Sequence, residues 1–581
     1  MPIYALTLKY VYECISFSYF QRGLLVQMLF TSFTPSTSAI GDSVVLSALL
    51  GIFPLIVFFV MLGVFKLATH WCALGSLAVA FASAVIGFGM PVSLAGLSAL
   101  QGAAFGIAPI IYIVIAAVWL YNLTVTSGRA DDVRAVFSAV GKGDIRIQAL
   151  LVAFSFCGLL EGLAGFGAPV AIVAAMLVTL GLSPLKAAVA TMVGNAINVG
   201  FGAMAIPMTT AGRLGGVPGA EVAATASSIT PWIATFVPIL LLAIIDGKRG
   251  LKELWLVAIV QGVVTSFGQI IAAKFISYEL TAVFASLLGF AVTAAILTKI
   301  KPQTPAEFRS QGLDNSKDTG KLDAGRITLA LMPYWLVVII FAIAKLWRFG
   351  IDIPQLLAST DEKIEWPGLY GQLMTPAGEV SASPIYNLQT LSSPGTMIVL
   401  TALIVAFVYG KNSSGNRFDY SFSRGLRTLV DTVVTLKLSL LTIALVMSLA
   451  YVMNFSGQTV AIGAALAATG SAFAFLSPIL GWIGTAVTGS ATSSNALFAN
   501  LQSTAAHGAS LDPGILLSAN SIGGGIGKIV SPQNLAIAST AVGKVGAEPE
   551  ILRKVAPWSI GLLIYLCTIV FLATQGIIPT L

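Results

Sequence analysis

Long apolar stretches recur along almost the whole chain, and they restrict its fold more than any other feature of the sequence. Each is continuous for about 18 to 25 residues, the length that an α-helix needs to cross about 30 Å of hydrocarbon. They lie near 43–65, 71–90, 107–125, 147–163, 228–245, 254–272, 280–298, 327–347, 394–409, 428–452, 460–480 and 555–577. A membrane barrel would instead alternate apolar and polar residues along each strand. The sequence therefore predicts an all-α polytopic membrane protein.

The scarcity of charge excludes a water-soluble protein with a single anchor. Charged residues make up 9% of the chain and hydrophobic residues 57%, whereas a soluble domain carries about 25% charged residues. The net charge of +7 fits lysine and arginine gathered in cytoplasmic loops, so we expect no nucleic-acid partner. The four cysteines lack the paired spacing of a metal site, and two histidines are too few for one. We expect neither a metal nor a cofactor.

Charges in the connections between the apolar stretches set the expected orientation. The acidic loop 350–393, with Lys363 as its one base, is placed outside. The C-terminus is placed outside as well. Lysine and arginine dominate the connections that we place in the cytoplasm, which are 126–146, 246–252, 299–326, 410–427 and 544–554.

The cytoplasmic loop 299–326 divides the chain into a first transmembrane half, 43–298, and a second half, 327–581. Each half contains one apolar segment that is broken by Gly, Pro, Ser, Thr and Asn, at 164–212 and at 481–545. Such backbone is tolerated at membrane depth only where protein buries it or a cavity adjoins it. We therefore predict broken or re-entrant helices there. The N-terminal segment 1–42 has no role that the sequence defines.

The two broken segments share a pattern. Residues 195–207 match 520–532 at an offset of 325 as N-x-I-x-x-G-x-G-x-x-x-x-P. Coincidence is the alternative in a chain with 57 glycines. The expected span count has the first copy follow a segment that runs outward and the second a segment that runs inward. That predicts inverted repeats, a signature of secondary transporters whose binding site lies at the interrupted segments.

Neither an ATP-driven pump nor an enzyme is supported. The glycine-rich run Gly523-Gly-Gly-Ile-Gly-Lys528 has Ile529 where a phosphate-binding loop needs Ser or Thr, and it lacks the first glycine of that motif. A catalytic constellation of an intramembrane hydrolase is also missing from the sequence.

Glu161 lies in an apolar run directly before the first broken segment. A carboxylate at such a position is costly and should face the bundle interior or a water path. We predict that it binds and releases the coupling proton. The alternative is a structural carboxyl that hydrogen-bonds the opposing segment and fixes its packing.

Lys528 lies in the second broken segment and is the candidate cation for a substrate carboxylate. Its alternative is an ammonium group that reaches a membrane interface. Four other charged residues are lesser candidates that we expect nearer to helix ends or the inner loop, namely Lys186, Arg213, Lys437 and Asp431.

A run of small polar side chains follows Gly489 in the second broken segment. At the tip of a re-entrant hairpin, its hydroxyls and freed backbone N–H groups could replace the water shell of a small anion. The alternative is close helix packing. The candidate substrate-binding residues are Ser490, Thr492, Ser493, Ser494 and Asn495, with further amides at Asn195, Asn198, Asn520, Gln533 and Asn534. We expect Asn500 and Gln502 to face a neighbouring helix.

Four stretches of the broken segments and their flanks form a recognisable set. They are Leu160-Glu-Gly-Leu-Ala-Gly-Phe-Gly-Ala-Pro-Val-Ala-Ile172, Phe201-Gly-Ala-Met-Ala-Ile-Pro207, Ser493-Ser-Asn-Ala-Leu-Phe498 and Gly527-Lys-Ile-Val-Ser-Pro-Gln533. In order and spacing they resemble signatures of the L-lactate permease family. The resemblance covers roughly residue 43 to the end. Two features differ from the family: Ala491 stands where many members have an acidic residue, and the first 40 residues resemble no family start.

The resemblance implies a proton symporter for L-lactate, with glycolate and D-lactate as related substrates, in a bacterial plasma membrane. It also implies kinship with ion-transporter folds built of inverted repeats with paired re-entrant hairpins, some of which move substrate by an elevator-like shift. A homodimer is a further expectation.

Two other functions remain open at this point. A sodium-coupled carrier of a related small carboxylate fits the hydroxyl-rich segment equally well, because hydroxyl and carbonyl oxygens also hold Na⁺. A channel or a membrane enzyme is the more distant alternative.

Overall fold

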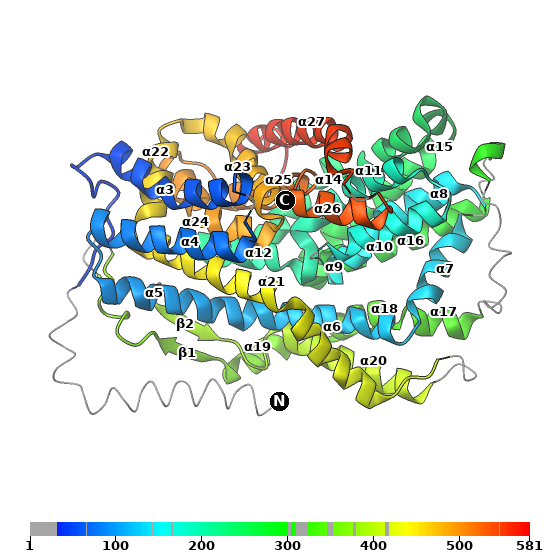
Figure 1. The fold of residues 1–581 in the computed structure, drawn as a ribbon, viewed down its shortest axis with the longest axis horizontal. Coiled ribbons are helices and arrows are strands. Elements are labelled where there is room, and N and C mark those ends of the chain that lie inside the picture. Colours follow the sequence, from blue (N-terminus) through cyan, green and yellow to red (C-terminus); the bar gives the residue numbers. More distant parts are fainter. Residues whose placement is uncertain are drawn as a thin grey trace. The chain divides into compact units, whose positions relative to one another are not determined.

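The computed structural model describes residues 32–580, apart from 66, 142, 164, 166, 300–303, 310–322, 345–352, 376–378, 413–417 and 545. Most of the N-terminal segment 1–42 therefore lies outside the described residues. The described chain is mostly helical (Figure 1). It divides into two compact units. Ten of its helical segments are long and apolar enough to cross a membrane, or up to 12 if each of two bent pairs is one span. This confirms the prediction of an all-α polytopic membrane protein.

The first unit comprises the described residues within Met1–Tyr112, Ile353–Thr396 and Leu438–Ala468. Its helices are α3 (Val44–Gly63), α4 (Thr69–Ala82) with η1 (Ser83–Gly87), α5 (Val92–Phe105) with η2 (Gly106–Ile111), α19 (Ile353–Leu357) with η10 (Ala358–Thr360), and α22 (Gln458–Ala467). Side chains hydrogen-bond backbone carbonyls of neighbouring helices. Ser76 Oγ on α4 donates to Pro54 O on α3 over 2.7 Å, and Gln458 Nε2 on α22 donates to Ala80 O on α4 over 3.0 Å.

The predicted external loop contains an antiparallel pair of strands that the sequence analysis missed. Strand β1 (Glu362–Glu365) pairs with β2 (Ile385–Leu388), with Ile364 opposite Tyr386. Four-residue strands are too short to show clear alternation. The hydroxyl of Tyr386 donates to Ala108 O over 2.6 Å and so attaches this sheet to η2, directly after α5.

The second unit comprises Ile113–Asp352, Met397–Lys437 and Thr469–Leu581. In its N-terminal part the helices are α6 (Tyr112–Thr126), α7 (Ala130–Val140), α8 (Ile145–Leu150) with η3 (Leu151–Phe156), α9 (Cys157–Leu163), α10 (Ala168–Thr179), α11 (Pro184–Asn195), η4 (Ala196–Phe201), α12 (Gly202–Gly215), α13 (Gly219–Ile229), α14 (Pro231–Ala234), α15 (Val237–Ile271) with η5 (Ala272–Ile276), η6 (Tyr278–Leu280) and α16 (Thr281–Lys299).

The remaining helices are η7 (Ala306–Phe308), α17 (Ala324–Ala330), α18 (Met332–Ala344), α20 (Pro394–Lys411), α21 (Phe422–Ser456), η11 (Gly470–Ala472), α23 (Phe473–Thr488), α24 (Ala491–Gly508), α25 (Pro513–Lys528), α26 (Pro532–Ala541) and α27 (Glu548–Thr574). Helix α21 contributes to both units. The stretch 460–480, predicted as one span, is divided between α22 and α23. Gly470 interrupts it with a φ of +59°, a conformation that favours glycine.

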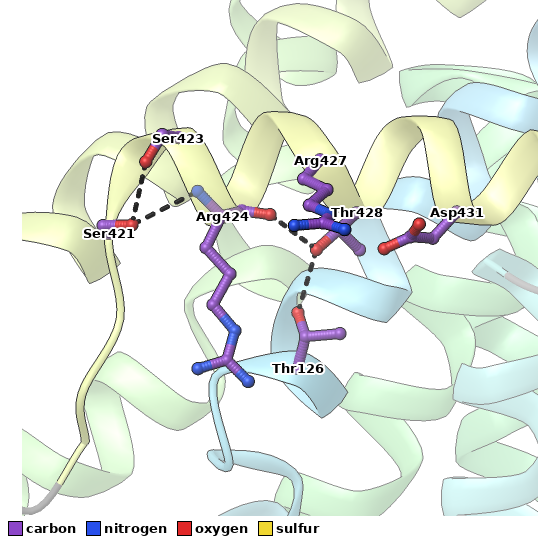
Figure 2. A pocket seen from close by; sticks show the side chains of 7 residues that line it. All are labelled: Thr126, Ser421, Ser423, Arg424, Arg427, Thr428 and Asp431. Carbon is purple, nitrogen blue, oxygen red and sulfur yellow. Dashed lines mark hydrogen bonds between the residues drawn. The ribbon is translucent and has the colours of Figure 1, made fainter.

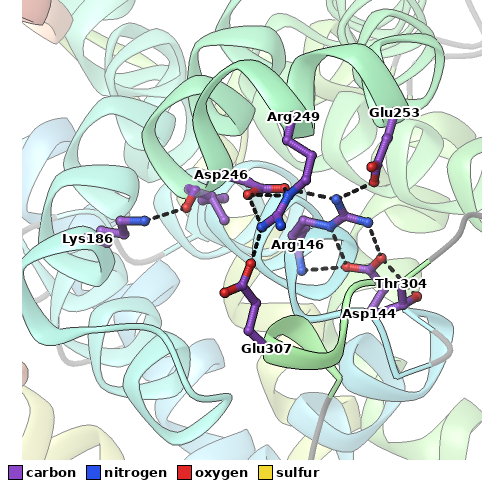
Figure 3. Close-up of polar contacts among 9 residues, drawn as sticks. Asp144, Arg146, Lys186, Asp246, Arg249, Glu253, Thr304 and Glu307 are labelled. Atoms are coloured by element: carbon purple, nitrogen blue, oxygen red, sulfur yellow. Dashed lines mark hydrogen bonds and ion pairs between the residues drawn. The ribbon is translucent and has the colours of Figure 1, made fainter.

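Three of the predicted cytoplasmic connections meet at one end of the second unit (Figure 3). Arg146, with a fully buried side chain, forms ion pairs with Asp144, Asp246 and Glu253 at 2.8, 2.9 and 2.6 Å. Arg249 bonds both Asp246 and Glu307. These contacts join 126–146, 246–252 and 299–326, which agrees with their predicted location on one side of the membrane.

Glycines allow α23 and α25 to pack with their backbones almost touching. A Cβ atom added to Gly481 would lie 2.0 Å from Asn520 O, one on Gly523 2.3 Å from Pro478 O, and one on Gly527 2.2 Å from Trp482 O. No real side chain fits at such distances, so these positions require glycine. Much of the glycine in the second broken segment therefore serves helix packing.

The two predicted broken segments are interrupted at corresponding places. Helix α9 ends at Leu163, which the offset of 325 places on Thr488, the last residue of α23. Within α12, residues 203–205 have left-handed backbone angles, and they correspond to 528–530, where α25 ends before α26 begins at Pro532. The structure thus adds matching helix breaks to the matching residues. The inverted sense of the repeat stays a prediction.

Candidate functional site

A buried ion pair joins the two broken segments. Lys528 Nζ, at the end of α25, donates to Glu161 Oε1, in the last turn of α9, over 2.8 Å. The side chains are 6% and 3% exposed, respectively. The two residues are 367 positions apart in sequence, and the sequence analysis gave them separate roles.

Asn195 completes the surroundings of the carboxylate. Its Nδ2 donates to Glu161 Oε2 over 2.8 Å, so each carboxylate oxygen accepts a hydrogen bond. The thiol of Cys157, on the same helix as Glu161, donates to Asn195 Oδ1 over 3.3 Å. Taking two charges out of water is costly, and only good geometry with further hydrogen bonds offsets the cost. Asn195 therefore holds the carboxylate in place.

The backbone that contacts Glu161 belongs to the helix break at 202–205. A Cβ atom on Gly202 would lie 2.8 Å from Glu161 Oε1, so the carboxylate occupies the space that a side chain would need. Directly afterwards Ala203, Met204 and Ala205 have φ values of +43°, +58° and +56°. Left-handed backbone costs roughly 1–2 kcal/mol for each residue with a Cβ. Strain of this kind gathers at binding sites and switch regions.

Lys528 is placed by the end of its helix. The C-terminus of a helix carries partial negative charge, which favours a cation. The backbone carbonyl of Lys528 accepts from Ser531 Oγ and Asn534 Nδ2, each over 3.1 Å. Asn534 was a candidate substrate ligand, and the structure shows it in this capping role.

A second cluster, of amides, lies in the second broken segment. Asn520 Nδ2 donates to Asn495 Oδ1 over 2.7 Å, and Gln502 Nε2 donates to Asn520 Oδ1 over 3.1 Å. Asn495 Nδ2 donates to Ser521 Oγ and to Pro207 O, over 3.0 and 2.9 Å. The cluster therefore joins α24 and α25 to α12, and Gln502 bonds a neighbouring helix as expected.

The two clusters are adjacent because η4 packs directly on α25. A Cβ atom on Gly525 would lie 2.3 Å from Ala196 O, and one on Gly200 would lie 3.4 Å from Ser521 O. Asn195 and Asn520, which are aligned with each other at the offset of 325, thus lie in neighbouring polar clusters. The contact is between the two copies of the shared pattern themselves.

The hydroxyl run is partly used for packing. Ser490 caps α24 by accepting from Ser493 N over 3.2 Å, and Ser494 Oγ donates to Gly481 O over 3.0 Å. Thr492 and Ser493 are buried. Gln533 Oε1 lies against Gly489, where an added Cβ would be 2.4 Å away. The run therefore lies at the helix break as predicted, beside Gln533, and Ser494 takes the packing role of the alternative interpretation.

Asn198 stands apart from both clusters. Its Oδ1 is buried and has no hydrogen-bond partner among the described residues, and the same holds for Ser286 Oγ. Both side chains face Gly158, where an added Cβ would lie 2.6 Å from Asn198 Nδ2 and 2.5 Å from Ser286 Oγ. Two unsatisfied polar groups thus lie one helical turn from Glu161. The sequence analysis missed Ser286, Ser521 and Cys157; of these, Cys157 could have been found by its spacing four residues before Glu161.

The lesser charged candidates lie elsewhere. Lys186 Nζ donates to Ile245 O over 2.7 Å near the start of α11, and Arg213 is in the last turn of α12, both near helix ends as expected. The expectation was wrong for Lys437, which lies well inside α21 and is exposed. Because the sequence around Lys437 is apolar, it did not show that the helix that begins in the basic loop 410–427 continues through this residue.

Comparison with known proteins matches nearly the whole chain. A family model described as L-lactate permease matches residues 47–576. L-lactate permease of Bacillus subtilis (strain 168) is 35% identical over 567 residues, which cover 93% of this chain and 98% of that protein. Glycolate permease GlcA of Escherichia coli (strain K12) is 35% identical over 526 residues, which cover 87% of this chain and 92% of that protein. Among solved structures, Neisseria gonorrhoeae MtrF aligns with a TM-score of 0.42 at 14% identity, covering 82% of this chain and 83% of that chain.

The family match spans both broken segments and therefore includes Glu161, Asn195, Asn495, Asn520 and Lys528. The four signature stretches of the sequence lie within it as well. By the extent of the family match and the identity to its members, the chain belongs to the L-lactate permease family.

Proposed function

We propose that this protein carries L-lactate or glycolate, and D-lactate as a related substrate, into the cell together with a proton. The relatives at 35% identity are named L-lactate permease and glycolate permease, which supports the substrate class. The observation that carries the coupling is the buried pair between Glu161 and Lys528.

Charge balance supplies the coupling mechanism. The empty site is neutral because the carboxylate of Glu161 balances the ammonium of Lys528. A substrate carboxylate that binds Lys528 alone adds a buried negative charge, and a proton that binds Glu161 alone leaves a buried positive charge. An uncompensated buried charge is strongly unfavourable. Only the empty site and the site that holds both proton and substrate are neutral, so the two bind together.

Neighbouring groups would orient the substrate. When Glu161 is protonated, the ammonium of Lys528 can turn to the substrate carboxylate, and Asn195 keeps the acid in place. The unsatisfied amide oxygen of Asn198 is an acceptor for the hydroxyl group that lactate and glycolate share. The hydroxyls of Thr492 and Ser493 and the amide of Gln533 are further candidates at the second break.

A sodium-coupled carrier is the competing proposal, because Na⁺ could supply the balancing positive charge. Uptake of radiolabelled L-lactate into proteoliposomes separates the two, with an imposed pH gradient and with or without Na⁺. We expect accumulation that follows the pH gradient and is indifferent to Na⁺. Accumulation driven by Na⁺ at equal pH on both sides would refute proton coupling.

We further propose that the protein is placed in the bacterial plasma membrane with its C-terminus outside and acts as a homodimer. The positively charged connections support this orientation, and Figure 3 shows three of them in contact. A C-terminal tag should be accessible to antibody in intact spheroplasts, and cross-linking in the membrane should give a dimer.

A further inference from the structure

A cavity of about 660 Å³ opens at the start of α21, away from the Glu161 site. Figure 2 shows its walls, which come from the first turns of α21 and the end of α6. It is lined by Thr126, Ser421, Ser423, Arg424, Arg427, Thr428 and Asp431. Its lining carries two cations and one anion, so the cavity has a net positive charge.

The two arginines are available to a ligand. Arg424 donates to the backbone carbonyl of Asp419 over 3.2 Å, and its guanidinium carbon lies 5.9 Å from the Tyr420 ring. Neither Arg424 nor Arg427 is ion-paired with a carboxylate in the described part of the chain, and both are exposed. The nearby Arg129 differs, because it is fully buried between the rings of Tyr409 and Phe418.

Hydroxyl groups add neutral hydrogen-bonding partners to the cavity. Ser421 Oγ accepts from Arg424 N over 3.2 Å and lies 3.0 Å from Ser423 Oγ. Thr126 Oγ1 on α6 lies 3.3 Å from Thr428 Oγ1 on α21. The first turn of α21 also contributes the positive end of a long helix. Phosphate oxygens are well matched by arginines together with hydroxyls and helix N–H groups.

Hydrogen bonds join the two helices that form the walls of the cavity. Trp119 Nε1 on α6 donates to Gly425 O on α21 over 2.9 Å. Asn122 Nδ2 donates to Thr432 Oγ1 over 2.9 Å. These bonds lie on both sides of Thr428 along α21 and fix the helix against α6.

An exposed apolar stripe continues from the cavity along α21. Phe422, Leu426, Val430 and Val434 repeat at every fourth residue and are 39%, 41%, 60% and 58% exposed. Residues spaced by four share one face of a helix. The stripe begins at the loop 410–427, whose lysine and arginine content predicts the cytoplasmic membrane surface. A cationic, hydroxyl-lined cavity thus adjoins an apolar surface at the expected level of lipid headgroups.

We propose that this cavity binds the headgroup of an anionic phospholipid, with Arg424 and Arg427 on the phosphodiester and the acyl chains along the stripe. A free phosphate would use the same cationic groups but would have no use for the stripe, and this favours lipid. Basic clusters at the cytoplasmic surface attract anionic lipids. The site is independent of the transported substrate.

The test uses the full-length protein purified in detergent and incubated with phosphatidylglycerol or phosphatidylcholine of the same acyl composition. Native mass spectrometry measures the retained lipid. We expect preferential retention of phosphatidylglycerol, reduced about tenfold or more by combining Arg424→Gln and Arg427→Gln, because two charge-assisted contacts are lost. The double Arg→Lys variant should retain most of the preference and shows that the fold is intact.

A matched control removes two exposed charges from another predicted cytoplasmic segment, by Arg553→Gln with Lys554→Gln. Retention should remain at the level of the unchanged protein. An equal loss in this control would show unspecific surface attraction and overturn the proposal. Inorganic phosphate or glycerol phosphate should not displace the bound lipid. If either one displaces it at the concentration at which phosphatidylglycerol itself binds, the site is one for free anions and the proposal is overturned.

Discussion

At the scale of single residues, the proposed coupling depends on one carboxylate and one ammonium group. From sequence alone, Glu161 and Lys528 could each be recognised as polar groups in apolar, glycine-rich surroundings. Their pairing could not be predicted, because contacts between residues 367 positions apart depend on how the helices pack. Asn198 and Ser286 show the same limit: only the structure reveals that both lie unsatisfied against Gly158.

The role of the ammonium group can be tested by Lys528→Gln. We expect the apparent KM for lactate to rise severalfold, because the substrate carboxylate loses its counter-charge. The variant also leaves Glu161 without its cation, and breaking a buried pair costs about 3–5 kcal/mol, so its thermal midpoint should fall as well.

The exposed Lys437 on α21 provides the matched control for this change. Lys437→Gln should leave both the apparent KM and the thermal midpoint unchanged. An unaltered KM in the folded Lys528→Gln protein would mean that Lys528 serves only the structure.

At the scale of elements, the sequence predicted the location of the helix breaks better than their backbone conformation. The glycine- and proline-rich segments 164–212 and 481–545 contain the interruptions that the pattern suggested. The left-handed turn at 203–205 could not be predicted, because alanine and methionine ordinarily continue a right-handed helix. The strands β1 and β2 were missed because four residues carry too little pattern. The capping role of Asn534 likewise depends on the position of the Lys528 carbonyl, which only the fold defines.

Because α23 packs closely on α25, we expect one methyl group added at a contact glycine to lower the stability of the protein strongly. Gly481→Ala would place a Cβ 2.0 Å from Asn520 O, and overpacking costs typically about 1–3 kcal/mol. We expect a lower thermal midpoint and reduced transport, measured by thermal unfolding in detergent and by lactate uptake. Gly561→Ala on α27 is the control, because nothing lies within 4 Å of its added Cβ. Equal stability of the two variants would contradict the packing described for α23 and α25.

At the scale of the whole molecule, the apolar runs largely determine the helical membrane fold. The offset of 325 predicted a repeat, and the structure places the helix breaks of both copies at corresponding residues. The direction in which each copy crosses the membrane follows from loop charges alone and remains a prediction, together with any elevator-like movement.

The inverted sense can be measured by labelling single cysteines in a cysteine-free background. Ser183, between α10 and α11, and Ser510, between α24 and α25, are both exposed and lie in corresponding connections of the two copies, where the offset of 325 places Ser183 on Gly508. An impermeant maleimide should label Ser183→Cys and Ser510→Cys from opposite sides of sealed membranes. Labelling of both from one side would exclude an inverted repeat.

In the proposed mechanism, protonation of Glu161 couples the proton to the substrate. Glutamine resembles the protonated acid and leaves the ammonium of Lys528 free at every pH. Glu161→Gln should therefore keep lactate exchange across proteoliposomes but lose accumulation driven by a pH gradient. Glu279→Gln, at another buried glutamate, whose carboxylate accepts from the Ser277 hydroxyl, should keep both activities. The decisive measurement is the lactate accumulation ratio at an imposed pH gradient in these variants. We expect a ratio of about one for Glu161→Gln and a ratio that follows the gradient for Glu279→Gln. Full accumulation by Glu161→Gln would contradict proton coupling through Glu161.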